Sequence, residues 1–361
     1  MLSAEERQRY ARHLSLPDFG EAAQERLGRG RVLVIGAGGL GSPALLYLAA
    51  AGVGHIVVVD NDHVDASNLQ RQILYRESDI GRLKAEVAAE RLRELNHLVT
   101  IEAVPKRFSR ESALALVRAT DVVVDGSDNF ATRYLVNDAC VMTDRPFVYG
   151  AIQGFDGQLA VFNWQGGPTY RCLFPEPIAS ELAPNCAQAG VLGVLPGIVG
   201  TWQATEAIKI LSGVGVPLSG KLLLWNALTM AVQTVSLAAD PRSRPIQDLP
   251  EDADVTCNAN VEIDASELRE KLAGPDVQLI DVRESWERAS DAILPSLHVP
   301  LAALEQLGTL APLRGLSRER LTVIYCAHGI RSLRAVEILQ EEGFRQVKSL
   351  RGGIAAWRSS R

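Results

Sequence analysis

A cysteine and an arginine near the C-terminal end of the chain are spaced for thiol chemistry. The segment from Cys326 to Ser332 follows an apolar run and precedes a helical pattern. In a loop of this form, backbone N–H groups turn inward and bind an anion at the start of the helix. That field favours a thiolate, and it stabilises a persulfide anion in the same way. We therefore expect Cys326 to be catalytic, within a loop formed by Ala327, His328, Gly329, Ile330, Arg331 and Ser332.

The length of this loop separates sulfur transfer from phosphate-ester chemistry. Four residues lie between Cys326 and Arg331, whereas a cysteine phosphatase needs a longer loop to surround a phosphate ester. The shorter loop suits a smaller sulfur donor. An inert module that has lost its cysteine is the other alternative, and the presence of Cys326 argues against it. We assign His328 no role in proton transfer, because a histidine at a loop tip usually faces solvent.

A glycine-rich turn near the start of the chain can bind phosphate. Gly36, Gly38 and Gly41 follow an apolar run and precede a helical pattern. Glycines let the backbone approach a phosphate closely, and the helix N-terminus favours the anion. Asp60 follows at the end of the next apolar run, where a carboxylate can bind ribose hydroxyls. The turn alone also fits an NAD-dependent oxidoreductase or a purely structural glycine turn.

Charged residues after Asp60 favour ATP cleavage over hydride transfer. Arg71 and Lys84 can stabilise charge on the phosphates, and Asp128 can hold magnesium there. A dehydrogenase does not need this set. Taken singly, Lys84 and Arg12 also fit solvated surface side chains, so the combination carries the inference.

Together these motifs resemble the adenylation domain of the ubiquitin-activating superfamily, in the branch that adenylates sulfur carriers for molybdopterin and thiamine synthesis. The similarity runs from about Arg9 to about Leu237. It implies ATP and magnesium as cofactors, with magnesium near Asp128. It also implies a homodimer, since Arg12 would reach the phosphates of the partner protomer. The candidate nucleotide-binding residues are Gly36, Gly38, Gly39, Gly41, Asp60, Ser67, Asn68, Leu69, Gln70, Arg71, Lys84, Asp128 and Asn129.

The C-terminal part of the chain resembles a rhodanese domain from about Val261 to Trp357. The motifs that carry the resemblance are Asp281 to Glu284, the loop at Cys326, and Arg351 to Trp357. The segment from Ala292 to Ser296 departs from the His-x-Pro-Gly that related sequences usually carry. The sulfur donor can therefore differ, with thiosulfate and a cysteine desulfurase as the candidates.

Two cysteines of the first domain have family counterparts. Cys186 would either release the product from an acyl disulfide or serve as a small buried hydrophobe. Cys172 matches the first ligand of a structural zinc site, but Pro175 stands where the second ligand would be. The segment from Pro241 to Pro245 holds no cysteine either. A structural zinc ion needs a full set of cysteine or histidine ligands, so we expect none.

Composition limits the class of protein. The 361 residues are 47% hydrophobic and 22% charged, with a net charge of -6, which suits a globular protein and disfavours nucleic acid as a partner. The apolar stretch from Val32 to Gly54 contains a glycine-rich turn and Pro43, so we do not expect it to span a membrane. No signal peptide is evident at the N-terminus. Five widely spaced cysteines indicate a reducing cytoplasm rather than a disulfide framework.

Apolar runs that alternate with helical patterns predict an α/β fold. Strands at 31–35, 56–59 and 122–124 with helices at 42–51 and 84–95 indicate a Rossmann-like domain with a mostly parallel sheet. Ligands of such sheets bind at the carboxyl ends of the strands. A smaller α/β domain follows, with strands at 277–280, 321–325 and 347–350 and a helix at 332–342. We predict an adenylation domain at 1–238, a proline-marked linker at 239–260 and a rhodanese-like domain at 261–361.

The sequence thus predicts ATP-dependent adenylation of a ubiquitin-like sulfur-carrier protein that ends in Gly-Gly. A persulfide on Cys326 would then form a C-terminal thiocarboxylate on the carrier. The alternatives are an NAD-dependent oxidoreductase with a sulfurtransferase module, and a non-enzymatic scaffold that binds the carrier. The candidate catalytic residues are Cys326, Cys186, Arg12, Arg71 and Lys84.

Overall fold

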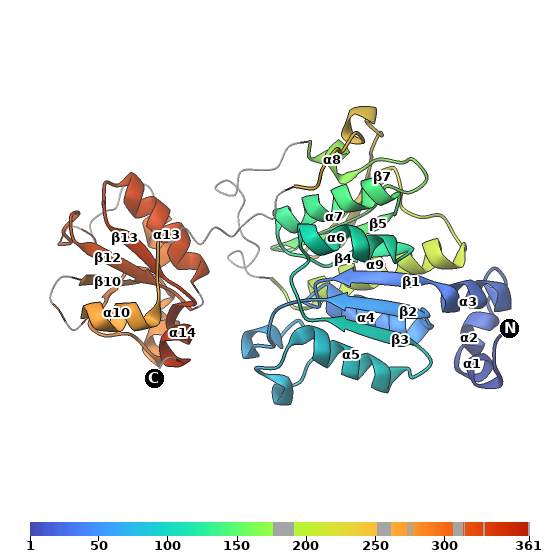
Figure 1. Cartoon of the computed structure of the whole chain (residues 1–361), viewed down its shortest axis with the longest axis horizontal. Helices are drawn as coiled ribbons and strands as arrows, with labels where there is room; N and C mark the ends of the chain where they lie inside the picture. The colour runs from blue at the N-terminus through green and yellow to red at the C-terminus, as the bar shows by residue number, and fades with distance from the viewer. Residues whose placement is uncertain are drawn as a thin grey trace. The chain divides into compact units, whose positions relative to one another are not determined.

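The computed structural model describes residues 1–175, 191–250, 261–272, 274, 277–305, 313, 315–327 and 329–359. Cys186, Cys257 and His328 lie outside the described residues. The chain divides into two compact units, Met1–Asp252 and Ala253–Arg361, which are treated separately below (Figure 1). Among the described residues, no helix has the length and apolar character needed to cross a membrane.

One large sheet forms the centre of the first unit. Its spatial order in the described residues is β3-β2-β1-β4-β5-β6-β7-β8, parallel from β3 to β5 and antiparallel from β5 to β8. The strands are β1 (Arg31–Ile35), β2 (His55–Val59), β3 (Thr100–Val104), β4 (Val122–Asp125), β5 (Phe147–Gln153), β6 (Asp156–Phe162), β7 (Lys221–Asn226) and β8 (Ala231–Ser236). From β1 the chain continues through β2 and β3 on one side of β1, and then returns to form β4 on the other side of β1. This reversal of strand order, between β1 and β4, is where open α/β sheets bind ligands.

Helices cover both faces of this sheet (Figure 1). One face carries α3 (Gly20–Arg29), α4 (Gly41–Ala51), α5 (Lys84–Leu95) and α9 (Val194–Ser212). The other carries α6 (Arg110–Arg118), α7 (Phe130–Thr143) and α8 (Tyr170–Leu173). The alternation of side chains along a strand explains why continuous apolar runs form β1 and its neighbours. Val32 and Val34 enter the core under α4, while Leu33 and Ile35 enter the core under α7.

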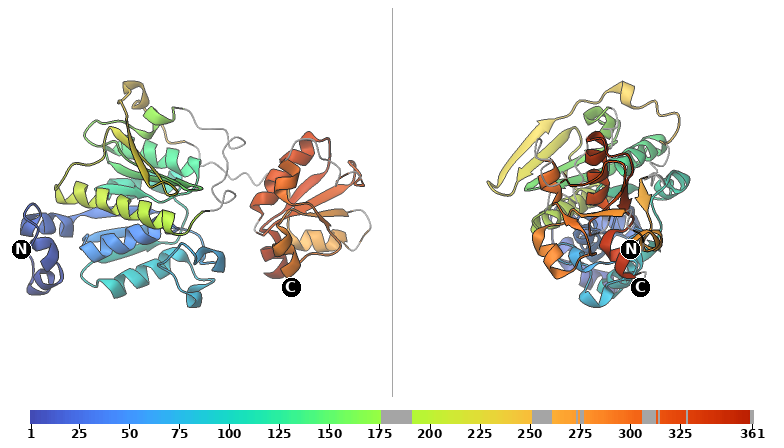
Figure 2. Two further views of the ribbon diagram at one scale, coloured as in Figure 1. Left: turned by 180° about the vertical axis from the view of Figure 1, so that it is seen from behind. Right: turned by 90° about the vertical axis from the view of Figure 1, so that its left-hand side faces the viewer.

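Two short N-terminal helices, α1 (Ala4–Arg9) and α2 (Ala11–Leu14), lie at the end of the sheet where β1 and β2 begin. The Tyr10 hydroxyl accepts a hydrogen bond of 2.9 Å from Asn96. The Tyr10 ring lies so close to Gly52 that a Cβ there would be 2.4 Å from it. The N-terminus, marked in Figure 2, lies at this end of the first unit.

Part of the segment predicted as a linker packs on the first unit. It contains the short helix η3 (Pro241–Ser243). Leu249 is buried in the core under α7. Arg110 donates to the Leu249 carbonyl at 2.8 Å and forms an ion pair with Asp248. The polar composition of this segment concealed the packing, because a single leucine supplies the buried surface.

The described strands of the second unit form a parallel sheet in the order β11-β10-β12-β13-β9. The strands are β9 (Glu262–Ile263), β10 (Val277–Asp281), β11 (Leu297–His298), β12 (Leu321–Tyr325) and β13 (Val347–Leu350). The helices are α10 (Ala265–Leu272), α11 (Ser285–Ser290), α12 (Leu301–Glu305), α13 (Ile330–Glu341) and α14 (Gly353–Ser359). The predicted α/β class is therefore confirmed in both units. Helix α13 begins two residues earlier than predicted, so that its first turn includes Arg331.

Candidate functional site

The turn between β1 and α4 requires glycine. Gly36 has a φ of +84°, in the left-handed region. A Cβ on Gly41 would lie 1.9 Å from the carbonyl oxygen of Gly36, so any side chain there would force α4 away from β1. The Gly36 N–H donates to the Val59 carbonyl, and the Gly126 N–H donates to the Ile35 carbonyl, both at 2.8 Å. The predicted phosphate-binding turn is thus held between the ends of β2 and β4.

Asp60 ties this turn to the end of β2. Its Oδ2 accepts the Ala37 N–H at 2.7 Å, and its Oδ1 accepts the Asp62 N–H at 2.8 Å. Each oxygen keeps a second lone pair, which suits a pair of ribose hydroxyls. Burial raises the pKa of Asp60 above its usual range, against the opposite effects of the Lys84 charge and the two amide donors.

Basic side chains approach the same turn. Lys84 begins α5 and is only 5% exposed, with its Nζ 2.9 Å from Oδ2 of Asp62. The Arg71 guanidinium donates to the Ser67 carbonyl at 3.1 Å, and the Arg71 Cδ lies 3.5 Å from where a Cβ on Gly39 would be. The structure therefore brings together the glycine turn, Asp60, Arg71 and Lys84, which we call the nucleotide site.

The segment from Ser67 to Gln70 reaches this site from a short helix, η1 (Ala66–Asn68). Asp65 caps η1 by accepting the Ser67 N–H at 2.8 Å. Gln70 lies against Gly193, where a Cβ would be 2.2 Å from the Gln70 carbonyl oxygen. These contacts fix the backbone that carries Arg71.

The loop after β4 brings Asp128 to the same end of the sheet. Asp125 is fully buried and accepts the Ser127 N–H at 3.0 Å and the Ser127 hydroxyl at 2.6 Å. Burial raises the pKa of Asp125. Asn129 caps α7 by accepting the Thr132 N–H at 2.9 Å. The exposed Asp128 is therefore presented from a loop that is fixed on both sides.

Arg12, in contrast, lies at the other end of the strands. It is exposed on α2, next to His13, whose ring nitrogen is 2.9 Å from Oε1 of Gln24. Gln24 in turn donates to the Ala51 carbonyl, at the end of α4 that is remote from Gly41. The structure therefore separates Arg12 from the nucleotide site within one chain.

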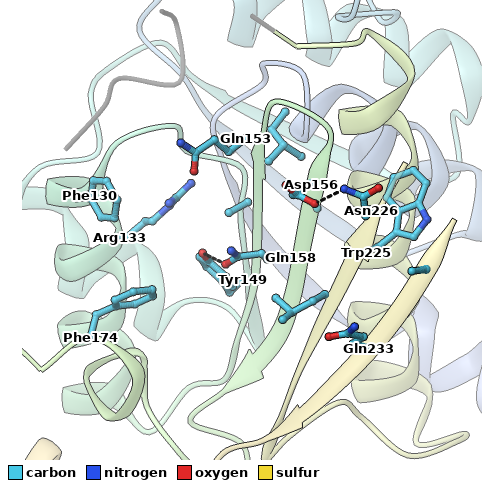
Figure 3. A pocket seen from close by; sticks show the side chains of 15 residues that line it. Phe130, Arg133, Tyr149, Gln153, Asp156, Gln158, Phe174, Trp225, Asn226 and Gln233 are labelled. Atoms are coloured by element: carbon cyan, nitrogen blue, oxygen red, sulfur yellow. Dashed lines mark hydrogen bonds between the residues drawn. The ribbon is translucent and has the colours of Figure 1, made fainter. Parts of the chain in front are cut away.

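A cavity of about 600 Å³, which we call the β5–β8 pocket, is lined by residues of α7 and of strands β5 to β8 (Figure 3). Arg133 lies at one end of it and donates to the Ser127 carbonyl at 3.2 Å. The Arg133 guanidinium lies 5.5 Å from the ring centre of Phe130 and 5.4 Å from that of Tyr149. The polar lining comes from side chains on β5 to β8, among them Gln153, Gln158, Asn226 and Gln233. The lining also includes the carboxylate of Asp156, which accepts from Asn226 at 2.7 Å. Aromatic walls with amide groups can bind the backbone of an extended peptide.

Sequence reasoning missed this pocket, although α7 contained a usable signal. Arg133 lies in the first turn of α7, which begins directly after the capping residue Asn129. The residues from β6 to β8 carry no motif that would mark them.

The second unit places Cys326 directly after β12. Its thiol is 1% exposed and accepts the Gly329 N–H at 3.1 Å, with the Ser332 hydroxyl at 3.5 Å. Gly329 has a φ of +96°. A Cβ on Gly353 would lie 2.4 Å from the Cys326 carbonyl oxygen, so the glycines let α14 approach the loop. We call the described residues 326, 327 and 329–332 the persulfide loop.

A buried ion pair supports this loop. Arg283, 3% exposed, donates to both carboxylate oxygens of Asp281 at 3.0 and 2.8 Å. The hydroxyl of Tyr325, the residue before Cys326, donates to Asp281 at 2.8 Å. Burial alone would raise the pKa of Asp281, but these hydrogen bonds outweigh it and hold the pKa below the usual range. Arg288 donates to the carbonyl and hydroxyl of Ser296, which fixes the segment that departs from the rhodanese pattern.

Cys172 lies among hydrogen-bond donors that join α8 to η3. Its thiol accepts the Thr169 N–H at 3.3 Å and the Asp240 N–H at 3.2 Å, and the Ser243 hydroxyl lies 3.1 Å away. Burial raises the pKa of the Cys172 thiol, but the hydrogen bonds outweigh it and the net shift is downward. Among the described residues, no group of three or more His, Cys, Asp or Glu side chains could hold a metal ion.

Replacing Cys172 with alanine is expected to lower the stability of the first unit by about 1–2 kcal/mol, because the partly buried donors lose their acceptor. For a unit of this size that corresponds to a fall in Tm of roughly 2–8 °C in scanning calorimetry of the full chain. Cys172→Ser keeps an acceptor and should lose less. Equal Tm values for the alanine variant and the wild type would contradict this role.

Together, the two sites define an enzyme that activates a substrate with a nucleotide and carries sulfur on a cysteine. The chain belongs to the ThiF family, whose model matches residues 10–245, and residues 264–360 match the rhodanese-like domain. The probable adenylyltransferase/sulfurtransferase MoeZ of Mycobacterium tuberculosis is 42% identical over 372 residues, covering 99% of this chain and 94% of that protein. The adenylyltransferase and sulfurtransferase MOCS3 of Mus musculus is 39% identical, covering 99% and 86%.

Other relatives match the first unit. The sulfur carrier protein adenylyltransferase of Thermus thermophilus is 52% identical over 251 residues, covering 68% of this chain and 93% of that protein. The solved structure of E. coli MccB with ATP has a TM-score of 0.55 at 22% identity, covering 61% of this chain and 67% of that one, and shows the fold. The protein is thus an adenylyltransferase and sulfurtransferase, and the oxidoreductase and scaffold alternatives are not favoured.

Proposed function

We propose that the first unit adenylates the C-terminal glycine of a ubiquitin-like sulfur carrier that ends in Gly-Gly, and that Cys326 then supplies the sulfur. The observation that carries this proposal is the meeting of the glycine turn, Asp60, Arg71 and Lys84 at the point where strand order reverses. The Thermus thermophilus relative, a sulfur carrier protein adenylyltransferase, supports the same substrate class.

In the first step, a carrier carboxylate oxygen attacks the α-phosphate of ATP, and pyrophosphate leaves with its electron pair. Asp60 binds the ribose hydroxyls, and the glycine turn at the start of α4 binds the phosphates. Arg71 and Lys84 stabilise the charge that develops on the leaving group. The exposed carboxylate of Asp128 suits a magnesium ion, which would neutralise phosphate charge when bound.

The β5–β8 pocket offers a path for the carrier's tail. Arg133 donates to the Ser127 carbonyl, so the positively charged end of the pocket lies next to the loop that carries Asp128. A tail of small residues can lie across β5, β6 and β7, and its terminal carboxylate would then meet Arg133.

In the second step, the outer sulfur of the Cys326 persulfide attacks the acyl-adenylate carbonyl and displaces AMP. The product is an acyl disulfide that joins the carrier to Cys326. Attack by the Cys186 thiolate would then free the carrier thiocarboxylate and form a disulfide between Cys186 and Cys326. Joining both units in one chain, through a segment ending near residue 260, raises the effective concentration of the donor to roughly millimolar. Thiosulfate and a cysteine desulfurase are the candidate sources of sulfur.

We further propose a homodimer in a reducing cytoplasm. Arg12 is exposed at the end of the sheet opposite its own nucleotide site, so it is placed to serve a second chain. Its guanidinium would bind phosphate oxygens there.

The test is exchange of labelled pyrophosphate into ATP by the full chain, with a panel of carriers ending in Gly-Gly. Exchange should require a carrier and should vanish when the last glycine of its tail is removed. Exchange without any carrier, or its absence with every carrier in the panel, would contradict the proposed adenylation.

A further inference from the structure

The arginine of the persulfide loop is held by a glutamate from a neighbouring helix. Arg331 donates from Nη1 to Oε2 of Glu287 at 2.7 Å and from Nη2 to Oε1 at 2.6 Å. Glu287 lies on α11, and its Oε2 also accepts the Glu284 N–H at 2.9 Å. The side chains are 25% and 13% exposed. Paired, bidentate geometry of this kind fixes the guanidinium and compensates its charge.

The surroundings of this pair decide how much positive charge the loop presents to a donor. Arg331 lies between Gly329 and Ser332, which both contact the Cys326 thiol, so its charge can act on an anion that binds there. The exposed Glu284 adds a second negative charge nearby. Arg283, which donates to the Glu287 carbonyl at 3.5 Å, is already paired with the buried Asp281. Glu287 therefore offsets the charge of Arg331 by direct contact, whereas solvent screens the exposed Glu284.

A small inorganic donor depends on that charge. Thiosulfate is a dianion, so an uncompensated arginine beside the thiolate would attract it, and an arginine that already binds a carboxylate attracts it less. In the transfer step, the Cys326 thiolate attacks the outer sulfur of thiosulfate, the S–S bond breaks, and sulfite leaves with the electron pair. A persulfide anion remains on Cys326, and no other oxidant or reductant is needed.

We propose that Glu287 is a specificity-determining residue that weakens the binding of small dianionic sulfur donors by neutralising Arg331. This inference depends on the proposed role of Cys326 as the sulfur acceptor. Glu287 acts through Arg331 and contacts no reacting atom, so it is a positioning residue.

The test compares Glu287→Gln with the wild type in thiosulfate-to-cyanide sulfur transfer by the full chain. The glutamine keeps the shape but not the charge, so the KM for thiosulfate should fall by about three- to tenfold at low salt. The kcat should change less than about twofold, because the Gly329 N–H and the Ser332 hydroxyl still face the thiol. Glu287→Asp should restore the wild-type KM. Glu284→Gln is the matched control, and it should change KM by less than about twofold.

A double-variant cycle separates electrostatics from structure. Arg331→Met should raise the KM for thiosulfate. In that background, Glu287→Gln should no longer lower the KM. A purely structural Glu287 would instead give a lower kcat and lower Tm with unchanged KM, and this result would overturn the inference. Equal KM values for wild type and Glu287→Gln, or no turnover by either, would overturn it as well. Turnover that persists in Cys326→Ser would contradict the proposed role of Cys326 itself.

Discussion

Replacing Cys326 with serine is expected to abolish sulfur transfer while leaving carrier-dependent pyrophosphate exchange intact. The thiol accepts the Gly329 N–H at 3.1 Å and lies 3.5 Å from the Ser332 hydroxyl, so both donors face the position of the transferable sulfur. A serine hydroxyl can occupy this site but cannot carry a transferable sulfur atom. Thiocyanate formation from thiosulfate and cyanide should fall by on the order of a thousandfold or more, as for loss of other catalytic nucleophiles. Mass spectrometry should show no gain of sulfur on the carrier.

The matched control is Cys172→Ser, which makes the same change at a half-buried thiol of the first unit. It should leave both reactions within about twofold of wild type, since Cys172 contacts neither proposed site. Thiocarboxylated carrier produced by Cys326→Ser at the wild-type rate would show that sulfur reaches the acyl-adenylate by another route.

Local sequence signals predicted the elements that position the two sites. The strands β1 and β12 contain the buried apolar runs Val32–Ile35 and Val323–Tyr325, and the glycines between β1 and α4 allow few other backbone geometries. The predicted bounds of β1, α5, β12 and β13 match the structure residue by residue. The position of Asp60 could be predicted from these elements, because the end of a strand fixes where the next side chain lies.

The features that escaped prediction depend on contacts between distant parts of the chain. The antiparallel half of the first sheet, β5 to β8, carries no motif, so the sequence did not indicate that these strands line a pocket with α7. Glu287 and Arg331 are 44 positions apart, and nothing in either local pattern indicates their pairing. The packing of Leu249 on the first unit likewise depends on Arg110, in a helix far earlier in the chain.

Replacing Lys84 with alanine is expected to have the opposite pattern of effects from Cys326→Ser. Lys84 is almost fully buried at the start of α5, and its charge acts on Asp60 within the nucleotide site. In so sheltered a position, a positive charge stabilises developing phosphate charge strongly. Pyrophosphate exchange should therefore fall by about a hundred- to a thousandfold, whereas thiosulfate-to-cyanide transfer by Cys326 should be unchanged.

A companion variant, Asp62→Asn, decides whether Lys84 acts by its charge or by holding the fold. Asp62 is the carboxylate that Lys84 contacts at 2.9 Å, but its own side chain is 64% exposed. If the ion pair serves only to fix α5, both variants should lose exchange and stability together. If the ammonium group acts on the phosphates, Asp62→Asn should retain exchange within about threefold, because an exposed partner contributes little to stability. Full exchange activity in Lys84→Ala would remove Lys84 from the proposed mechanism and leave Arg71 as the basic residue to test next.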